Sequence, residues 1–193
     1  MSAEEIESYC PSNQQEWRDW LEQNHQEQQS LWLILYKTNS SKFNLSWSDA
    51  VDEALCFGWI DSTRRPINEE KFMQFFSQRK PKSNWSRINK EKVEKLIADG
   101  KMSEAGINSI EVAKENGSWT FLDDIEDLVI PPDFATELAA HSVANEFYQN
   151  LSKSIKKQIL YWLASAKREE TRRKRLQTII SEMNQQKVPN GFR

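Results

Sequence analysis

Cationic, indole and hydroxyl side chains gather at the ends of apolar segments in the stretch from Ala54 to Asn89. Arginine forks, an indole face and hydroxyl groups at a helix start are groups that bind a carboxylate or a phosphate. At the edges of strands and at a helix start, such groups can be aimed at a ligand without disturbing a core. The sequence therefore predicts one face or pocket that binds an anionic ligand through Trp59, Asp61, Arg64, Arg79, Trp85, Ser86 and Asn89.

The same residues also have a structural interpretation. Asp61 would pair with an arginine, Trp85 would pack in the core, and Asn89 would cap a helix. Ion pairs are often merely structural, so both interpretations stay open at this point. A concave pocket that uses Asp61 together with Arg79 would favour an enzyme acting on a small anionic molecule. Asp61 and Trp85 on opposite faces would exclude a shared site.

No catalytic signature accompanies these residues, so the sequence favours a binding or adaptor protein over an enzyme. His25 and His141 are the only histidines, and neither has a serine or cysteine partner at a spacing typical of a nucleophile and its base. Cys10 and Cys56 form no Cys-x-x-Cys pair, which predicts two free thiols and no metal site. With five glycines in total, the chain also lacks a glycine-rich phosphate loop, and no cofactor is expected.

A second cationic cluster lies between Lys167 and Arg175. Arg168, Arg172 and Arg175 fall on one face of the helix that is expected there, and this basic patch would meet either the acidic segment 123–127 or an outside anion. Nucleic acid is the least favoured partner, because the net charge is -3 and no known nucleic-acid-binding motif is present. Exposed ion pairs contribute about 0–1 kcal/mol each, so we expect Arg172→Ala with Arg175→Ala to leave the melting temperature nearly unchanged.

The 193-residue chain separates its charges: residues 1–58 and 102–152 are acidic, whereas residues 59–101 and 153–175 are basic. Basic blocks in an acidic protein attract anionic ligands or the chain's own acidic blocks. The expected partner is therefore a protein or a small anionic ligand. The first eleven residues lack the apolar region of a secretion signal, and no apolar run approaches about 18 residues, so we expect a cytoplasmic protein without a membrane span.

The apolar periodicity predicts an α+β fold, with a small, mainly antiparallel sheet packed with helices and a helical C-terminal domain. The run 31–36 is too short for a helix and predicts a buried central strand. Residues 59–64 and 72–76 flank a turn and predict an antiparallel hairpin. Helix starts are expected at Asn13, Ser46, Ser103, Asp133 and Ser152, and helix ends at Gly58, Gly100 and Gly117.

Four segments follow from this pattern. Residues 1–118 form the α+β domain, 119–132 form an acidic linker that ends in two prolines, 133–184 form the helical domain, and 185–193 form a mobile tail. In the helical domain, the apolar faces of 155–166 and 176–183 are expected to bury each other.

Three sequence segments together resemble the YdeI/OmpD-associated family of bacterial proteins, also called bacteriocin-protection proteins. They are Ala54-Leu55-Cys56-Phe57-Gly58-Trp59-Ile60-Asp61, the run from Arg79 through Ser86 with Asn89, and Ala166-Lys167-Arg168-Glu169-Glu170-Thr171-Arg172. The resemblance extends from about Trp17 to Met183, and the segment from Phe147 to Met183 is similar to the family's OmpD-associated C-terminal domain. One position departs from the family pattern, because Glu169 stands where a proline is expected.

The resemblance implies a binding or adaptor role in envelope stress or in resistance to bacteriocins and antimicrobial peptides. It implies no reaction, and it supplies no catalytic residues. Proline at position 169 would preset the first helical turn, whereas Glu169 suits that turn electrostatically, so the expected fold is unchanged.

Overall fold

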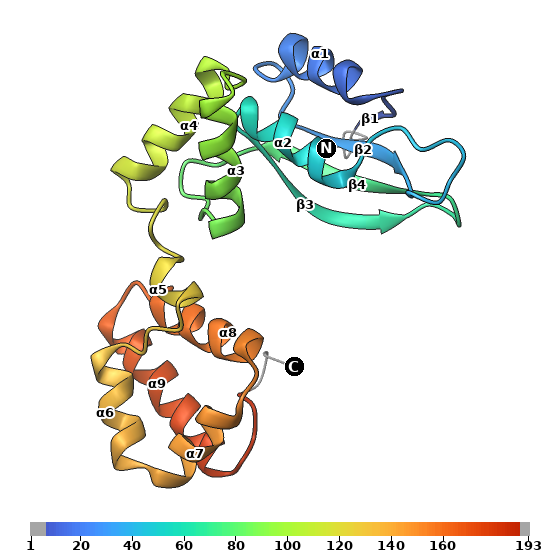
Figure 1. Cartoon of the computed structure of the whole chain (residues 1–193). Coiled ribbons are helices and arrows are strands. Elements are labelled where there is room, and N and C mark those ends of the chain that lie inside the picture. Colours follow the sequence, from blue (N-terminus) through green and yellow to red (C-terminus); the bar gives the residue numbers. More distant parts are fainter. Residues whose placement is uncertain (1–6, 190–193) are drawn as a thin grey trace, which may run out of the picture. The chain divides into compact units, whose positions relative to one another are not determined.

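The computed structural model describes residues 7–189 (Figure 1). By their contacts, the residues divide into two compact units, Met1–Thr120 and Phe121–Arg193. The start of the acidic N-terminal segment, residues 1–6, and the last four residues of the expected tail lie outside the described residues. Among the described residues, no helix has the length and apolar character that crossing a bilayer requires.

The first unit contains a four-stranded, mainly antiparallel sheet, as the sequence predicts. Its strands are β1 (Ser8–Tyr9), β2 (Ser30–Tyr36), β3 (Trp59–Pro66) and β4 (Lys71–Gln78), in the order β1-β2-β4-β3. The β3–β4 hairpin and the central position of β2 are confirmed. The parallel strand β1 was not expected, because a two-residue strand is too short to show a periodicity.

Strand β2 is buried on one face only, which corrects the expectation of a fully buried strand. Leu31, Leu33 and Leu35 are fully buried, and the residues between them remain partly exposed. The sheet therefore has an inner face toward the helices and an outer face.

The described residues of the first unit form the helices α1 (Gln14–Asn24), α2 (Trp47–Cys56), α3 (Arg87–Ala98) and α4 (Glu104–Glu115). Asn13, Ser46 and Ser103 cap α1, α2 and α4 through their side chains, as expected. Ser86 caps α3, so the expectation that Asn89 is the cap is wrong. Asn89 instead donates its backbone N–H to the Ser86 hydroxyl at 3.3 Å.

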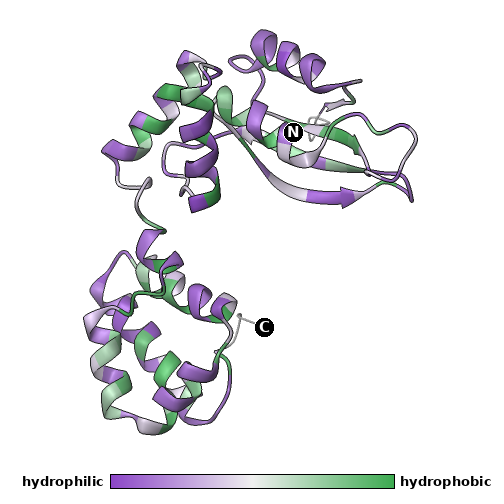
Figure 2. Cartoon of the chain, in the orientation of Figure 1, coloured by the Kyte–Doolittle hydropathy of each residue, from purple (hydrophilic) through white to green (hydrophobic). Residues whose placement is uncertain are grey.

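The core of the first unit is rich in aromatic side chains on the inner face of the sheet. Trp17, Trp59, Phe76 and Trp85 are fully buried there. Burying a large aromatic side chain contributes several kcal/mol to folding, which explains how a chain with so polar a surface stays folded. In Figure 2, β2 is coloured largely as hydrophobic and α1 largely as hydrophilic.

The end of α2 and the start of α4 meet at the Cys56 carbonyl. This oxygen accepts hydrogen bonds from the backbone N–H of Ser103 at 3.0 Å and from the Ser103 hydroxyl at 2.7 Å. Gly106 packs against the same carbonyl, and a Cβ at this position would lie 2.2 Å from the oxygen. The glycine therefore permits the close approach that sets α4 beside the end of α2.

The second unit is helical, as expected. Its helices are α5 (Asp123–Glu126), α6 (Pro132–Ala140), α7 (Ser142–Asn150), α8 (Lys153–Ala164) and α9 (Glu169–Asn184). Faces of α8 and α9 join one buried cluster that includes Leu163, Ile179 and Met183. Ser152 caps α8. The expectation that Asp133 caps α6 is wrong, because the helix begins at Pro132 and Asp133 lies in its first turn.

The segment 119–132 differs from the irregular acidic linker that the sequence predicts. It contains α5, and Ile125 is buried in the core of the second unit with Leu122, Leu128 and Ile130 packed nearby. Its acidic residues hide these apolar positions from a composition-based prediction. In the expected tail, Gln185 and Lys187 donate backbone hydrogen bonds to the Glu182 carbonyl, so the first part of the tail continues from α9 as a turn.

Candidate functional site

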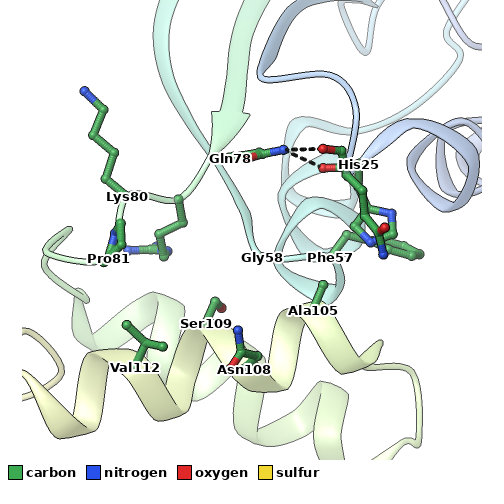
Figure 3. Close-up of a pocket in the computed structure, with 12 residues that line it drawn as sticks. His25, Phe57, Gly58, Gln78, Lys80, Pro81, Ala105, Asn108, Ser109 and Val112 are labelled. Atoms are coloured by element: carbon green, nitrogen blue, oxygen red, sulfur yellow. Dashed lines mark hydrogen bonds between the residues drawn. The ribbon is translucent and has the colours of Figure 1, made fainter.

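A pocket of about 330 Å³ lies in the first unit between the end of α2, the end of β4 and one face of α4. Figure 3 shows Ala105, Asn108, Ser109 and Val112 projecting from α4 toward the segments that carry Gly58 and Pro81. The spacing of these four α4 residues places them on one side of the helix. The opposite side of α4 carries Ile110 and Ala113 into the core, so one helix supplies both a core face and a pocket wall.

Gly58 shapes the corner where α2 ends and β3 begins. Its φ of +73° is the left-handed conformation that ends a helix, and a Cβ there would lie 3.1 Å from the Ala105 carbonyl oxygen. The Gly58 carbonyl accepts a hydrogen bond from the Arg79 backbone N–H at 2.9 Å. This contact brings the residues after β4 alongside the end of α2, where they border the pocket.

The loop after β4 is held in place by the end of α4. The Asn116 side chain donates to the Pro81 carbonyl at 2.7 Å, and the Ser118 hydroxyl donates to the same oxygen at 3.4 Å. The Trp85 backbone N–H donates to the Ser118 carbonyl at 3.3 Å. The pocket wall is therefore ordered before any ligand binds, which lowers the entropic cost of binding.

Arg79 is the most unusual charged residue at the pocket. Its guanidinium carbon lies 3.8 Å from the centre of the Trp85 ring, and its Nη1 donates to the Asn84 carbonyl at 3.0 Å. Its Nε and Nη2 are buried without a hydrogen-bond partner among the described residues. Burial lowers the pKa of Arg79 to about 10, and the charge of Asp61 partly opposes this shift. The guanidinium is thus a desolvated cation at pH 7 with unused donors.

The opposite wall is built from the end of α1 and the end of β4. Gln78 donates through Nε2 to the carbonyls of His25 at 2.8 Å and Gln28 at 2.9 Å, and Figure 3 shows Gln78 beside His25. The Nδ1 of His25 lies 2.8 Å from the Leu21 carbonyl, which can only accept. Nδ1 therefore carries a proton, and Nε2 bears the lone pair whenever the ring is neutral.

The electrostatic character of the pocket is cationic. The charged side chains Arg79 and Lys80 line it, and the described lining residues include no aspartate or glutamate. Asn108 and Ser109 add neutral hydrogen-bonding groups, while Phe57 and Val112 add apolar surface. In the described part of the chain, no group of three or more histidine, cysteine or acidic residues could hold a metal ion. The arrangement suits an anion with a small apolar part.

The structure brings together some of the predicted site residues. Arg79 lines the pocket, Trp85 lies beneath its guanidinium, and Ser86 caps the helix that follows. Trp59 is fully buried in the core, and its indole N–H donates to the His25 carbonyl at 3.1 Å. Trp59 and Trp85 therefore support the pocket from below and do not expose a face to a ligand.

Asp61 and Arg64 form a separate cluster on the inner face of the sheet. The Asp61 Oδ2 accepts hydrogen bonds from Trp47 Nε1 and from Gln74 Nε2, both at 3.0 Å. The Gln74 Oε1 accepts from the Nε of Arg64 at 3.2 Å, and the Arg64 guanidinium lies 4.2 Å from the Phe72 ring centre. Asp61 acts on Arg79 through its charge, but it does not line the pocket that Arg79 borders, so the two residues do not share the pocket that an enzyme site would use.

Two arginines of the predicted basic patch have structural roles, which corrects the expectation that they meet the acidic segment 123–127 or an outside anion. Arg172 forms two hydrogen bonds to the Asp133 carboxylate, at 2.7 and 2.8 Å, and a third to the Leu163 carbonyl at 3.0 Å. Arg175 donates to the Trp162 carbonyl and to the Ser165 hydroxyl. Both side chains thus satisfy carbonyls at the end of α8, and the acidic partner is Asp133 and not the segment 123–127. Arg168 is exposed just before α9.

Sequence reasoning missed the side chains of α4 and the end of α1 that line the pocket. Asn108 and Ser109 had a signal, because they lie on the face of α4 opposite its apolar residues, beside the small residue Ala105. His25 and Gln78 had no such signal, since they meet only through the packing of α1 against the sheet.

Comparison with known families gives two matches. Residues 9–109 match a family described as a domain of unknown function, DUF8412. Residues 127–186 match the family described as "Bacteriocin-protection, YdeI or OmpD-Associated", which confirms the expected resemblance over that part of the chain only. Among curated proteins and among solved structures, none matches the chain. Because the first match covers more than half of the sequence, the chain belongs to the DUF8412 family, and its second unit carries the YdeI/OmpD-associated segment.

Proposed function

We propose that the chain is a binding protein whose first unit holds a small anion, carrying a carboxylate or a phosphate group, in the pocket beside α4. The observation that carries the proposal is the desolvated guanidinium of Arg79, which borders the pocket. Within residues 7–189, two of its donors have no partner, and the pocket is lined by basic residues and by no carboxylate. Among the described residues, no carboxylate lies in contact with the Arg79 guanidinium. A buried cation without such a contact reduces stability, so its presence at a pocket favours a role in binding.

Binding is favoured over catalysis by the groups that surround the pocket. The Ser109 hydroxyl donates to the Gly106 carbonyl at 2.8 Å, as helix serines commonly do, and is not bonded to a base. The only acidic side chain in the original site prediction, Asp61, belongs to the separate cluster with Gln74. An enzyme acting on a small anion stays the second candidate, because His25 borders the pocket and offers Nε2 as a proton acceptor.

The second unit supports an adaptor role in this proposal. Its family is described by bacteriocin protection and by association with YdeI or OmpD. We propose that the chain acts as a ligand-binding adaptor in envelope stress or in resistance to bacteriocins and antimicrobial peptides, with the anion bound by the first unit as its signal. A protein partner would then bind in a ligand-dependent manner, which a pull-down with and without added anion would measure.

Arg79→Met tests the pocket directly. We expect this variant to bind inorganic phosphate, pyrophosphate or citrate at least about tenfold more weakly than wild type, because it loses the cation but keeps the apolar stem. We also expect its unfolding free energy to equal or exceed that of wild type, because unpartnered buried donors cost about 1–3 kcal/mol. Isothermal titration calorimetry and urea unfolding measure the two quantities.

Arg64→Met is the matched control, because Arg64 stacks on Phe72 and bonds to Gln74 outside the pocket. It removes the same charge from the same unit, and it should leave anion binding unchanged. If wild type binds none of the three anions, or if both variants weaken binding equally, the proposed pocket is wrong. A large loss of stability in Arg79→Met would instead assign Arg79 a structural role.

The ordered loop after β4 gives a second test that changes no charge. Asn116→Ala removes the donor to the Pro81 carbonyl, so the wall that carries Arg79 should become more mobile. We expect a loss of about 1 kcal/mol in stability and an anion affinity several-fold lower. Hydrogen–deuterium exchange of residues 79–85 should rise in parallel, and unchanged exchange there would contradict the tethering role of Asn116.

A further inference from the structure

The outer face of the sheet carries a regular array of aromatic and basic side chains. Because Leu31, Leu33 and Leu35 point inward, Trp32, Ile34 and Tyr36 of β2 point outward. The antiparallel register then fixes the outward residues of the neighbouring strands. Trp32 pairs with Phe75, Ile34 with Met73, and Tyr36 with Lys71, and Arg65 of β3 continues the row of Met73.

This face is not covered by the hydrophobic cores. Trp32, Tyr36 and Phe75 are only partly buried, and they belong to neither core cluster of the described chain. Three partly exposed aromatic side chains on one face of a sheet are unusual for a surface that only meets water. The inner face of the same strands already supplies the core, so packing does not explain the aromatic residues outside.

The cations of this face lie over its aromatic rings. The guanidinium carbon of Arg65 is 4.7 Å from the Trp32 ring centre, and the Lys71 ammonium is 5.6 Å from the Tyr36 ring centre. Phe75 meets Trp32 with ring centres 5.1 Å apart. None of the outward positions of β2 and β4 holds an acidic residue, although the chain has 29 aspartates and glutamates. The face is therefore aromatic and positively charged.

We propose that this sheet face binds single-stranded nucleic acid, with bases stacked on Trp32, Tyr36 and Phe75 and phosphates neutralised by Arg65 and Lys71. Unpaired bases stack on aromatic side chains of an open sheet, and basic residues beside them attract the backbone. A duplex keeps its base faces covered, so it lacks this mode of contact. A second copy of the chain is disfavoured, because self-association would place the unneutralised cations of two copies on the same interface.

Fluorescence anisotropy with a labelled twelve-nucleotide oligo(dT) tests the proposal on the full chain. Alanine substitution of a stacking aromatic residue costs about 1–3 kcal/mol per base, so Trp32→Ala should weaken binding about five- to 150-fold. Arg65→Ala with Lys71→Ala should make the slope of log K against log[salt] shallower by about 1.4, which corresponds to two lost phosphate contacts on a single strand.

Two controls separate binding from folding. Trp32→Leu keeps an apolar side chain but removes the aromatic face, so it should lose binding while its circular dichroism and melting temperature stay near wild type. Arg168→Ala removes an exposed cation from the second unit and should leave oligo(dT) binding unchanged. A duplex of the same length should bind at least tenfold more weakly than the single strand.

Three results would overturn the proposal. The first is an absence of oligo(dT) binding by wild type at low salt. The second is equal binding by wild type, Trp32→Leu and the double variant. The third is a concentration-dependent dimer in sedimentation that Trp32→Leu abolishes, since the face would then be an interface between copies. The anion pocket beside α4 shares none of these residues, so phosphate binding there and oligo(dT) binding on the sheet face can succeed or fail independently.

Discussion

Gly106→Ala is expected to destabilise the first unit by about 3 kcal/mol or to prevent its folding. An added Cβ would lie 2.2 Å from the Cys56 carbonyl oxygen, and this oxygen is fixed by two hydrogen bonds from Ser103. Neither backbone can move without breaking these bonds or opening the core, and overpacking of this kind costs about 1–3 kcal/mol or more. Urea unfolding followed by intrinsic tryptophan fluorescence measures the loss.

Gly117→Ala is the control, because it measures the cost of a strained backbone conformation without a steric clash. Gly117 has a φ of +81° and no atom within 4 Å of an added Cβ, so its substitution should cost only the roughly 1–2 kcal/mol of a left-handed residue. Gly106 lies inside α4, where alanine is otherwise favoured by about 1 kcal/mol. If Gly106→Ala is as stable as Gly117→Ala or more so, then α4 does not approach α2 as described.

The double variant Arg172→Ala with Arg175→Ala is expected to destabilise the second unit by about 3 kcal/mol. Together the two side chains satisfy carbonyls of Trp162 and Leu163, bond to Ser165, and tie α9 to Asp133 at the start of α6. Hydrogen bonds from charged donors contribute about 1.5–3 kcal/mol each, and the Asp133 contact contributes less because it is partly exposed. This result reverses the expectation drawn from the sequence.

Arg168→Ala with Lys174→Ala is the matched control on the same helix. It also removes two positive charges, but Lys174 is 72% exposed in its pair with Glu170, so the loss should stay within about 0.5 kcal/mol. Trp162 is the only tryptophan of the second unit, so its fluorescence reports on the unfolding of that unit. Hydrogen–deuterium exchange of α8 and α9 would show whether the loss of stability lies in the same unit. Equal stability of the two double variants would refute the structural role of Arg172 and Arg175.

The Asp133 pair also predicts a dependence on pH. Hydrogen bonding to Arg172 lowers the pKa of the Asp133 carboxyl below its usual value near 3.8. A group whose folded pKa is depressed stabilises the fold above its unfolded pKa, and this contribution is lost as the pH falls through the folded pKa. The stability gap between wild type and Arg172→Ala should therefore be constant above about pH 5 and narrow below about pH 4.

The elements of this fold could be predicted where a local pattern determines them. Asn13, Ser46 and Ser103 are helix caps that act within three residues, and Gly58 ends a helix by its own conformation. Asn89 was expected to cap α3, but Ser86, three residues earlier in the chain, takes that role. The start of α9 at Glu169 also follows from local electrostatics, because an acidic residue suits the first turn.

The candidate site was only partly predictable, because its partners are distant in sequence. Arg79 and Trp85 were identified by residue type, and only a short loop separates these two stacked residues in the sequence. Asp61 and Arg64 were assigned to the same site, but the sheet register places Gln74 beside them and directs them elsewhere. No pattern in the sequence predicts the register between β3 and β4.

The partners of the α9 arginines could not be predicted for a different reason. Periodicity placed Arg172 and Arg175 outside the buried face of α9, and this is where their helix presents them. Their side chains are long enough to reach back to the end of α8, where they donate to backbone carbonyls. Every residue has a backbone carbonyl, so the residue types in the sequence do not identify these acceptors. A pattern of side chains alone does not show such a partner.

The bonds that fasten the loop after β4 determine where the chain can be cut for work on the first unit alone. A fragment ending at residue 109, the limit of the DUF8412 match, would contain Arg79 and most of the pocket lining. It would lack Asn116 and Ser118, which hold the Pro81 carbonyl, and Trp119, whose ring packs 5.1 Å from that of Trp85. Such a fragment would have a weakened pocket, whereas one extending through Thr120 would retain these contacts.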